Sequence, residues 1–305
     1  MNRYLLRRLG HSVFILIGIS LVTFMLVHLT GDPASLYLPL DASPEDVEAL
    51  RTSLGLDRPL HQQYLEFVRG LVVGDFGQSM RHREDALNLV LRRLPATLQL
   101  ATAAMGLAVL AAIPLGVVAA TRRDSLISTA ASVLGLLGQS MPVFWMGIVM
   151  ILLFSVRLRL LPPSGRGSPV HLIMPAVAIG TYSMAMIMRL VRSAMLEVLG
   201  KDYVRTARSK GLPERLVIYK HSLRNALIPV ITVTGLQFGV LLGGAVITET
   251  VFSWPGLGRL LIQSFNNRDM PVIQAAVFVI AVMIVAVNLV TDLAYSRLDP
   301  TVRFG

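Results

Sequence analysis

The chain has 305 residues, of which 54% are hydrophobic and only 15% are charged, and it contains no cysteine. Because an ordinary soluble protein carries about 25% charged residues, this composition excludes a typical soluble enzyme and favours a protein embedded in a membrane. The formal net charge of +10 at pH 7 would also fit nucleic-acid binding, so the position of the charges along the chain has to decide between the two classes.

Six long segments contain no Asp, Glu, Lys or Arg. About 20 mainly apolar residues suffice to cross roughly 30 Å of hydrocarbon, and a charge at a helix centre costs about 2.5–3.5 kcal/mol on insertion scales. The sequence therefore predicts an all-α polytopic membrane protein with six transmembrane helices. The third segment is too long for one upright span, so we expect it to start late, to tilt or to bend near Pro142. The segments are 9–31, 94–121, 125–156, 167–188, 225–248 and 270–291.

The first segment follows Arg3, Arg7 and Arg8, as the apolar part of a signal peptide would. Its apolar run is too long for a signal peptide, however, and no small-x-small cleavage site follows it. We therefore expect residues 1–30 to form a cytoplasmic N-terminus and the first transmembrane helix.

Residues 31–95 are expected to form a mostly helical loop outside the membrane. Ser43 can cap a first helix, Gly55 can end it, and residues 57–59 can start a second helix that breaks at 74–77. This loop either packs as a cap over the helix ends or docks an external partner.

Residues 201–225 form a basic stretch between two apolar segments, which we expect to fold as two short helices joined at a glycine. Asp202 can cap a helix over 203–210. Gly211 suits the left-handed conformation that ends such a helix, and Pro213 suits the first position of the next one.

The first of these short helices would carry Tyr203, Ala207 and Lys210 on one face, where Ala207 leaves a small spot for close approach. That arrangement suits a short helix set into a groove of another protein. The alternative is a basic helix pair that rests on anionic lipid.

A turn rich in proline and glycine, residues 252–258, follows the fifth apolar segment. Its Pro-Gly-x-Gly sequence is expected to direct a short, half-apolar helix over 259–265 back toward the mouth of the helix bundle.

The Lys and Arg residues divide unequally between the two sides that six spans define. Sixteen lie on the side of the N-terminus and five lie in the two short loops opposite, while seven more are spread over 31–95 beside ten acidic residues. This positive-inside bias places both termini in the cytoplasm and 31–95 outside. Because the membrane accounts for the basic charge, we expect membrane lipid and no nucleic acid among the partners.

No active-site pattern is present. The phosphate-binding GxxxxGK[ST] loop is absent, as are HExxH, GxSxG and CxxC. Glu249 and Asp292 are the carboxylates that lie nearest to membrane depth, both near helix ends, and we interpret them as structural. Because a charged residue in a span can also mark a proton relay, a self-sufficient secondary transporter or channel remains the alternative. We expect no catalytic residue, metal site or cofactor in this chain.

The basic stretch resembles the EAA–x3–G loop of binding-protein-dependent ABC importer permeases. Residues 202–212 and 221–229 are similar to the dipeptide, oligopeptide and nickel branch of that family. The resemblance covers nearly the whole chain, and further matching segments are Gly31-Asp32-Pro33-Ala34, residues 54–59, 74–79, 94–98, 249–258, 268–271 and Leu298-Asp299-Pro300. The chain departs from the general loop in keeping only the second Ala of Glu-Ala-Ala, as Ala207. It also has His221 and Arg224 where the general loop ends in Ile-x-Leu-Pro.

The resemblance implies a type I ABC importer permease in the bacterial inner membrane, with residues 96–305 as its permease core. Its partners would be a second homologous permease, two ATP-binding subunits that hold ATP and Mg, and an external substrate-binding protein. The implied substrate is a peptide, nickel, glutathione or a metal–chelator complex.

One set of residues receives a role from this resemblance, and a second set receives a role as a hypothesis from the Pro-Gly-x-Gly turn. The set that couples the permease to an ATPase is Tyr203, Arg205, Ala207, Arg208, Lys210, Gly211 and Leu212. The set that would form an external gate, or contact the binding protein, is Phe252, Trp254, Pro255, Gly256, Leu257 and Gly258. For this second set the alternative is a turn and helix that simply fill the outer interface.

Overall fold

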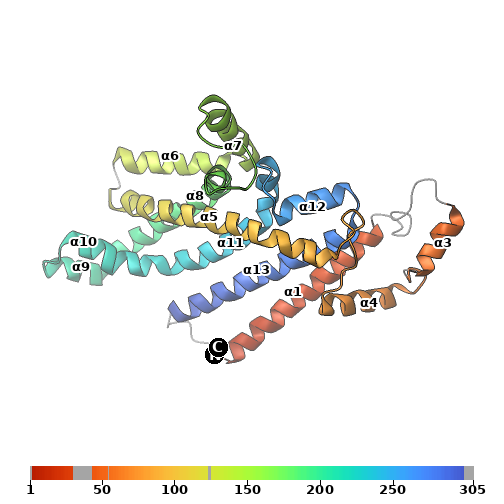
Figure 1. The fold of residues 1–305 in the computed structure, drawn as a ribbon. Helices are drawn as coiled ribbons and strands as arrows, with labels where there is room; N and C mark the ends of the chain where they lie inside the picture. The colour runs from red at the N-terminus through yellow and green to blue at the C-terminus, as the bar shows by residue number, and fades with distance from the viewer. Residues whose placement is uncertain (1, 30–42, 54, 123–124, 299–305) are drawn as a thin grey trace. The chain divides into compact units, whose positions relative to one another are not determined.

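The computed structural model describes residues 2–29, 43–53, 55–122 and 125–298, and within them the chain is helical (Figure 1). The described residues form no strand, and one isolated bridge joins Gln78 to Asp85. The all-α prediction is confirmed. The elements are α1 Asn2–Leu29, α3 Pro44–Ser53, α4 Leu60–Val73, α5 Ala86–Thr121, α6 Leu126–Ser140, α7 Val143–Met150, η1 Ile151–Arg157, α8 Val170–Leu199, α9 Asp202–Ser209, α10 Glu214–Leu216, η2 Val217–Leu223, α11 Arg224–Val251, α12 Leu257–Asn266 and α13 Met270–Leu298. The matching segments at 31–34 and 299–300 lie outside the described residues.

Five helices of the described part are long and apolar enough to cross a membrane. They are Arg7–Val27, Ala86–Thr121, Val170–Leu199, Glu214–Val251 and Met270–Ala294. Five of the six predicted spans thus correspond to single helices. The remaining segment, 125–156, is divided between α6 and the shorter apolar helix Val143–Arg157.

That segment breaks in two at Pro142. α6 ends at Ser140, Met141 is extended with ψ 128°, and α7 begins at Val143. The cause is local, because proline lacks an N–H and its ring disfavours the helical conformation of the residue before it. The predicted bend near Pro142 is therefore present as a complete break.

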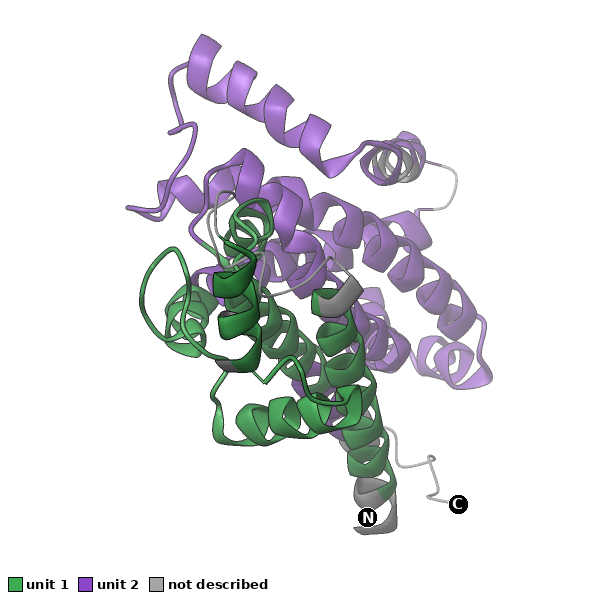
Figure 2. Ribbon diagram, turned by 90° about the vertical axis from the view of Figure 1, so that its right-hand side faces the viewer, with its two compact units in different colours: residues 1–95, 256–285 green, residues 96–255, 286–305 purple. Residues whose placement is uncertain are grey.

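The chain forms two compact units, which Figure 2 shows in green and purple. One unit comprises residues 1–95 and 256–285, and the other comprises residues 96–255 and 286–305.

The first unit has a core to which the segment after α4 contributes. Phe76, Leu89 and Val90 pack with Leu257 of α12 and Val272 of α13. Residues 76–90 are thereby fixed onto a segment that lies almost two hundred positions further along the chain.

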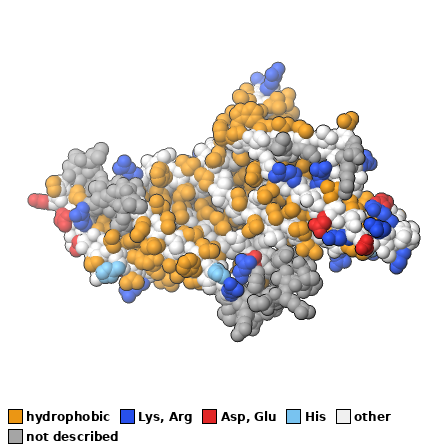
Figure 3. All heavy atoms as spheres, turned by 180° about the vertical axis from the view of Figure 1, so that it is seen from behind, with side chains coloured by type: hydrophobic (Ala, Val, Ile, Leu, Met, Phe, Trp, Pro, Cys, Tyr) orange, Lys and Arg blue, Asp and Glu red, His pale blue; other side chains and the backbone are white. Residues whose placement is uncertain are grey.

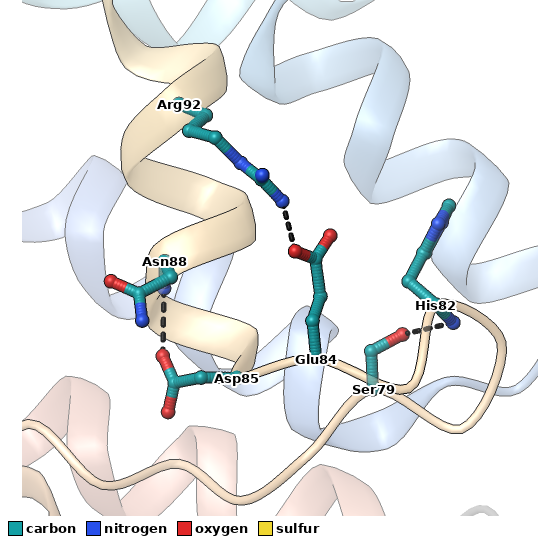
Figure 4. A network of polar contacts seen from close by, with 6 residues as sticks. All are labelled: Ser79, His82, Glu84, Asp85, Asn88 and Arg92. Atoms are coloured by element: carbon teal, nitrogen blue, oxygen red, sulfur yellow. Dashed lines mark hydrogen bonds and ion pairs between the residues drawn. The ribbon is translucent and has the colours of Figure 1, made fainter.

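A loop over residues 77–85 carries polar contacts that hold this unit together. The Ser79 hydroxyl donates to Asp269 Oδ2 at 2.5 Å, and Asp269 is 1% exposed. In Figure 4, Ser79 Oγ also accepts the His82 N–H at 3.0 Å, and Asp85 Oδ1 accepts the Asn88 N–H at 2.8 Å at the start of α5. The Asp85 contact is an N-cap that satisfies one of the free N–H groups of the helix.

The helix signals predicted for the loop are confirmed where the structure describes them. Ser43 Oγ accepts the Asp46 N–H at 3.1 Å and Asp46 Oδ2 accepts the Ser43 N–H at 3.2 Å, which is a reciprocal cap of α3. Gly55 and Gly74 have φ of 67° and 81° and follow the ends of α3 and α4. α4 packs on α1, where the Tyr64 hydroxyl and Ser20 Oγ lie 2.9 Å apart.

The second unit is built around α5, α8 and α11. A Cβ added to Gly180 of α8 would lie 2.8 Å from the Ala104 carbonyl oxygen of α5, so these two helices approach closely. α8 and α11 also pack on each other, and both lead to α9 and α10 (Figure 1).

Hydrophobic side chains cover much of the face drawn in Figure 3. Over the whole described surface, the large hydrophobic side chains that are exposed include Phe14 of α1, Leu110 of α5, Trp145 of α7 and Val240 of α11. An apolar surface of this extent is what contact with lipid requires.

Candidate functional sites

A helix hairpin of α9, α10 and η2 carries the basic stretch. α9 follows Lys201, which is extended with ψ 149°, and Asp202 is the first helical residue. The prediction that Asp202 caps a helix over 203–210 is therefore wrong by one position. As a carboxylate in the first turn, Asp202 still faces the partial positive charge of the helix N-terminus.

The corner of the hairpin has the hydrogen bonds of a Schellman motif. The Leu212 N–H donates to the Ala207 carbonyl at 3.3 Å, and the Gly211 N–H donates to the Arg208 carbonyl at 2.9 Å. Gly211 has φ +75°, which confirms the predicted left-handed glycine. A Cβ placed on Gly211 would meet nothing within 4 Å. Backbone conformation rather than crowding therefore requires the glycine.

The interior of the hairpin is a small apolar cluster of Val204, Ala207 and Val217. Val204 and Val217 are fully buried and Ala207 is 8% exposed. We expected Ala207 to be open to a groove of another protein, but the hairpin itself buries this side chain. Its side chain faces inward because positions 204 and 207 lie three apart, on the side of α9 that the hairpin itself buries.

The outer surface of the hairpin combines exposed charge with exposed apolar side chains. Arg205 and Lys210 are exposed, and Tyr203 and Leu212 are 44% and 36% exposed. The Tyr203 hydroxyl accepts a hydrogen bond from Asn225 Nδ2 at 3.0 Å.

Two further exposed apolar side chains, Leu216 and Tyr219, lie at i+4 and i+7 from Leu212. Sequence reasoning did not include them in the coupling set. The spacing of four and then three residues from Leu212 places all three side chains on one face of a helix, and this spacing could have indicated them.

Arg208 joins the two arms of the hairpin. Its Nη2 donates to Glu214 Oε1 at 2.7 Å and its Nε donates to Glu214 Oε2 at 3.2 Å. The hydrogen bond from Arg208 to Glu214 raises the pKa of the guanidinium. An exposed pair of this kind contributes only about 0–1 kcal/mol, but its two-point geometry fixes the orientation of the arms.

The turn after α11 is buried rather than presented to solvent. Phe252 and Trp254 are 2% and 1% exposed. The Trp254 indole donates to the Ala96 carbonyl at 2.8 Å, and the Gly165 N–H donates to the Phe252 carbonyl at 2.9 Å. Neither aromatic ring is therefore available for direct contact with an external protein in this structure.

The remaining residues of the predicted gate lie at the start of α12. Pro255 is half-buried, Gly256 and Gly258 are buried, and Leu257 is fully buried in the first unit's core. α12 spans Leu257–Asn266, so the predicted short helix is present and begins two residues earlier than expected.

Glu249 lies fully buried near the end of α11, where its Oε1 accepts the Thr97 hydroxyl at 2.6 Å. This contact supports the structural interpretation of Glu249. Asp292 is half-buried in α13. Over the described ranges, no group of three or more His, Asp or Glu side chains is placed to hold a metal ion.

Two family models match this chain, one over its N-terminal part and one over the rest. The model of the family "Binding-protein-dependent transport system inner membrane component" matches residues 112–304. The model described as "Binding-prot-dependent transport system membrane comp, N-term" matches residues 1–101.

Individual relatives match over the full length. The chain is 44% identical over 336 residues to the dipeptide transport system permease protein DppB of Escherichia coli (strain K12), with 99% of each chain covered. It is 43% identical over 334 residues to the di/tripeptide permease protein DppB of Pseudomonas aeruginosa (strain UCBPP-PA14), again with 99% of each covered. It is also 40% identical over 305 residues to the glutathione transport system permease protein GsiC of E. coli (strain K12), with 100% of each covered.

A solved structure, that of an amino acid ABC transporter with histidines, shares the fold. The TM-score is 0.51 at 20% sequence identity, over 69% of this chain and 94% of that chain. The family models and the full-length relatives set aside a self-sufficient secondary transporter or channel. The chain belongs to the family of inner-membrane components of binding-protein-dependent transport systems, and it is a permease subunit of an ABC importer.

Proposed function

We propose that this permease imports short peptides or the peptide-like solute glutathione. The observation that carries the proposal is the full-length similarity to permeases named for dipeptide and glutathione transport, at 44% and 40% identity.

The chain would form the translocation pathway together with a second homologous permease. Two cytoplasmic ATP-binding subunits would hold ATP and Mg, and an external binding protein would deliver the substrate. This chain itself would be non-catalytic. It would lie in the bacterial inner membrane with both termini in the cytoplasm, because the Lys and Arg excess lies on the side of the termini and of α9.

The hairpin would act as the mechanical link to an ATPase. Its arms are held together by the buried cluster at Ala207, by the Schellman corner at Gly211 and by the two-point Arg208–Glu214 pair. A push on α9 would therefore move the hairpin as one body. The second arm continues as a helix from Glu214 to Val251, so this movement would reach the far end of α11.

Reconstitution tests the proposal. The chain is co-expressed with the partner permease, ATPases and binding protein encoded with it, and the complex is placed in liposomes. Uptake of dialanine or glutathione is expected to require ATP and loaded binding protein. Uptake by the chain alone, driven by an ion gradient, would contradict the proposal.

A further inference from the structure

Arg166 lies at the end of the second unit that is opposite the coupling hairpin. It precedes α8, whose 30 residues span about 45 Å before the chain reaches α9. In space it meets Gln99 of α5 and the turn that follows α11. Residues from α5, from the loop before α8 and from the turn after α11 thus meet at this guanidinium.

The guanidinium is held on two sides. Its Nε donates to Gln99 Oε1 at 2.9 Å, and its central carbon lies 5.8 Å from the centroid of the Trp254 ring. That ring is itself fixed, because it is 1% exposed and its N–H donates to the Ala96 carbonyl at 2.8 Å. A cation at this distance over an indole face is attracted by the ring, and the contact orients the guanidinium plane.

The neighbouring backbone is fixed as well. Gly165 has φ +94°, and its N–H donates to the Phe252 carbonyl at 2.9 Å. The residue that carries the cation is therefore attached to the same turn that supplies the aromatic ring.

The two terminal amino groups of Arg166 remain available. The side chain is exposed, and no carboxylate forms an ion pair with it among the described residues. In the segment 31–95, by contrast, Arg58 pairs with Glu66 and Arg92 pairs with Glu84. A planar fork of N–H donors fixed in this way is suited to two parallel hydrogen bonds with a carboxylate.

We propose that Arg166 binds the free carboxylate of the transported substrate as it enters from the binding protein. This inference rests on the proposed function, since dipeptides and glutathione both carry a free carboxylate. Gln99 acts as a positioning residue through its bond to Nε, and its own amide N–H groups add donors beside the fork. A residue of this kind makes the permease select for anionic ends, in addition to any selection by the binding protein.

The test compares two probes in the complete complex in liposomes. Uptake of dialanine and of dialanine amide is measured at equal concentrations of loaded binding protein, and the ratio of the two rates is taken. The same binding protein serves every variant, so its own preference cancels when the ratios are compared. Arg166→Gln is expected to lower the acid-to-amide ratio about tenfold, as the loss of a charged hydrogen-bonded pair implies.

The controls separate charge from geometry. Arg166→Lys keeps the charge without the fork and is expected to lower the ratio partway, whereas Arg159→Gln, at another exposed arginine of the same loop, is expected to leave it unchanged. Should Arg166→Gln fail to assemble, Gln99→Ala, which releases the guanidinium without removing it, is expected to lower the same ratio.

Two results would overturn the inference. One is an unchanged ratio in Arg166→Gln. The other is weaker binding of the substrate-free binding protein to that variant, which would place the anion on the binding protein. A wild-type complex that takes up neither dialanine nor glutathione would instead refute the proposed function.

Discussion

Gly211 and Ala207 show how two small residues in one hairpin are required for different reasons. Gly211 has a left-handed backbone and open space around its missing Cβ, whereas Ala207 has an ordinary helical backbone and a packed side chain. The left-handed backbone at Gly211 could be predicted from the sequence, because a glycine after a short helix predicts a left-handed cap. The packing of Ala207 inside the hairpin could not be predicted, because residue spacing alone does not show which face of α9 the hairpin buries.

Gly211→Val is expected to uncouple the transporter without preventing insertion. Holding a residue with a side chain at φ +75° costs roughly 1–2 kcal/mol, so the corner would relax and misdirect α9. ATPase activity of the purified complex should lose its stimulation by loaded binding protein. Gly211→Asn is the matched control, because asparagine tolerates the left-handed region. Full stimulation in the Val variant would contradict the argument.

Ala207→Leu is expected to separate α9 from η2. Added bulk in a packed site costs about 1–3 kcal/mol, and Ala207 packs with Val204 and Val217. Substrate-stimulated ATPase activity should fall, whereas Arg205→Gln should have little effect because that side chain is 81% exposed and its contact to Asp202 is 3.7 Å long.

The opposite ranking would favour the lipid-anchor alternative. In that case the triple Arg205/Arg208/Lys210→Gln variant would lose uptake, and Ala207→Leu would retain it.

At the scale of the helix, close crossings in the second unit depend on glycine. A Cβ on Gly235 of α11 would overlap the Thr291 side chain of α13, while a Cβ on Gly244 of the same helix would meet nothing within 4 Å. We therefore expect Gly235→Ala to lower the thermal unfolding temperature of the isolated chain in detergent, and Gly244→Ala to leave it unchanged or raise it slightly. Equal effects of the two variants would show that the α11–α13 crossing is not tight.

The elements that the sequence predicted well are those with local signals. The reciprocal cap at Ser43 and Asp46 and the glycine after α4 depend on residues within one or two turns. What could not be predicted depends on distant partners. The burial of Trp254 requires the Ala96 carbonyl 158 positions away, and no pattern in residues 252–258 indicates it.

At the scale of the whole molecule, the topology can be tested directly because the chain has no cysteine. Single cysteines at Ser53, the last residue of α3, and at Ser209, which is exposed, would report the two sides of the membrane. An impermeant thiol reagent applied to intact cells should label position 53 and not 209, because the charge bias predicts that α9 is cytoplasmic. Labelling of position 209 alone would reverse the proposed orientation.

The break at Pro142 has a consequence for the surrounding bilayer. α6 has 15 residues and is about 22 Å long. The apolar helix Val143–Arg157 is no longer than α6. Neither matches a hydrocarbon layer of roughly 30 Å, so we expect lipid beside α6 and α7 to thin locally, at a cost that grows with acyl chain length. Uptake in liposomes should therefore decline as the phosphatidylcholine acyl chains are lengthened, and the transporter should concentrate in the thinner regions of a mixed membrane.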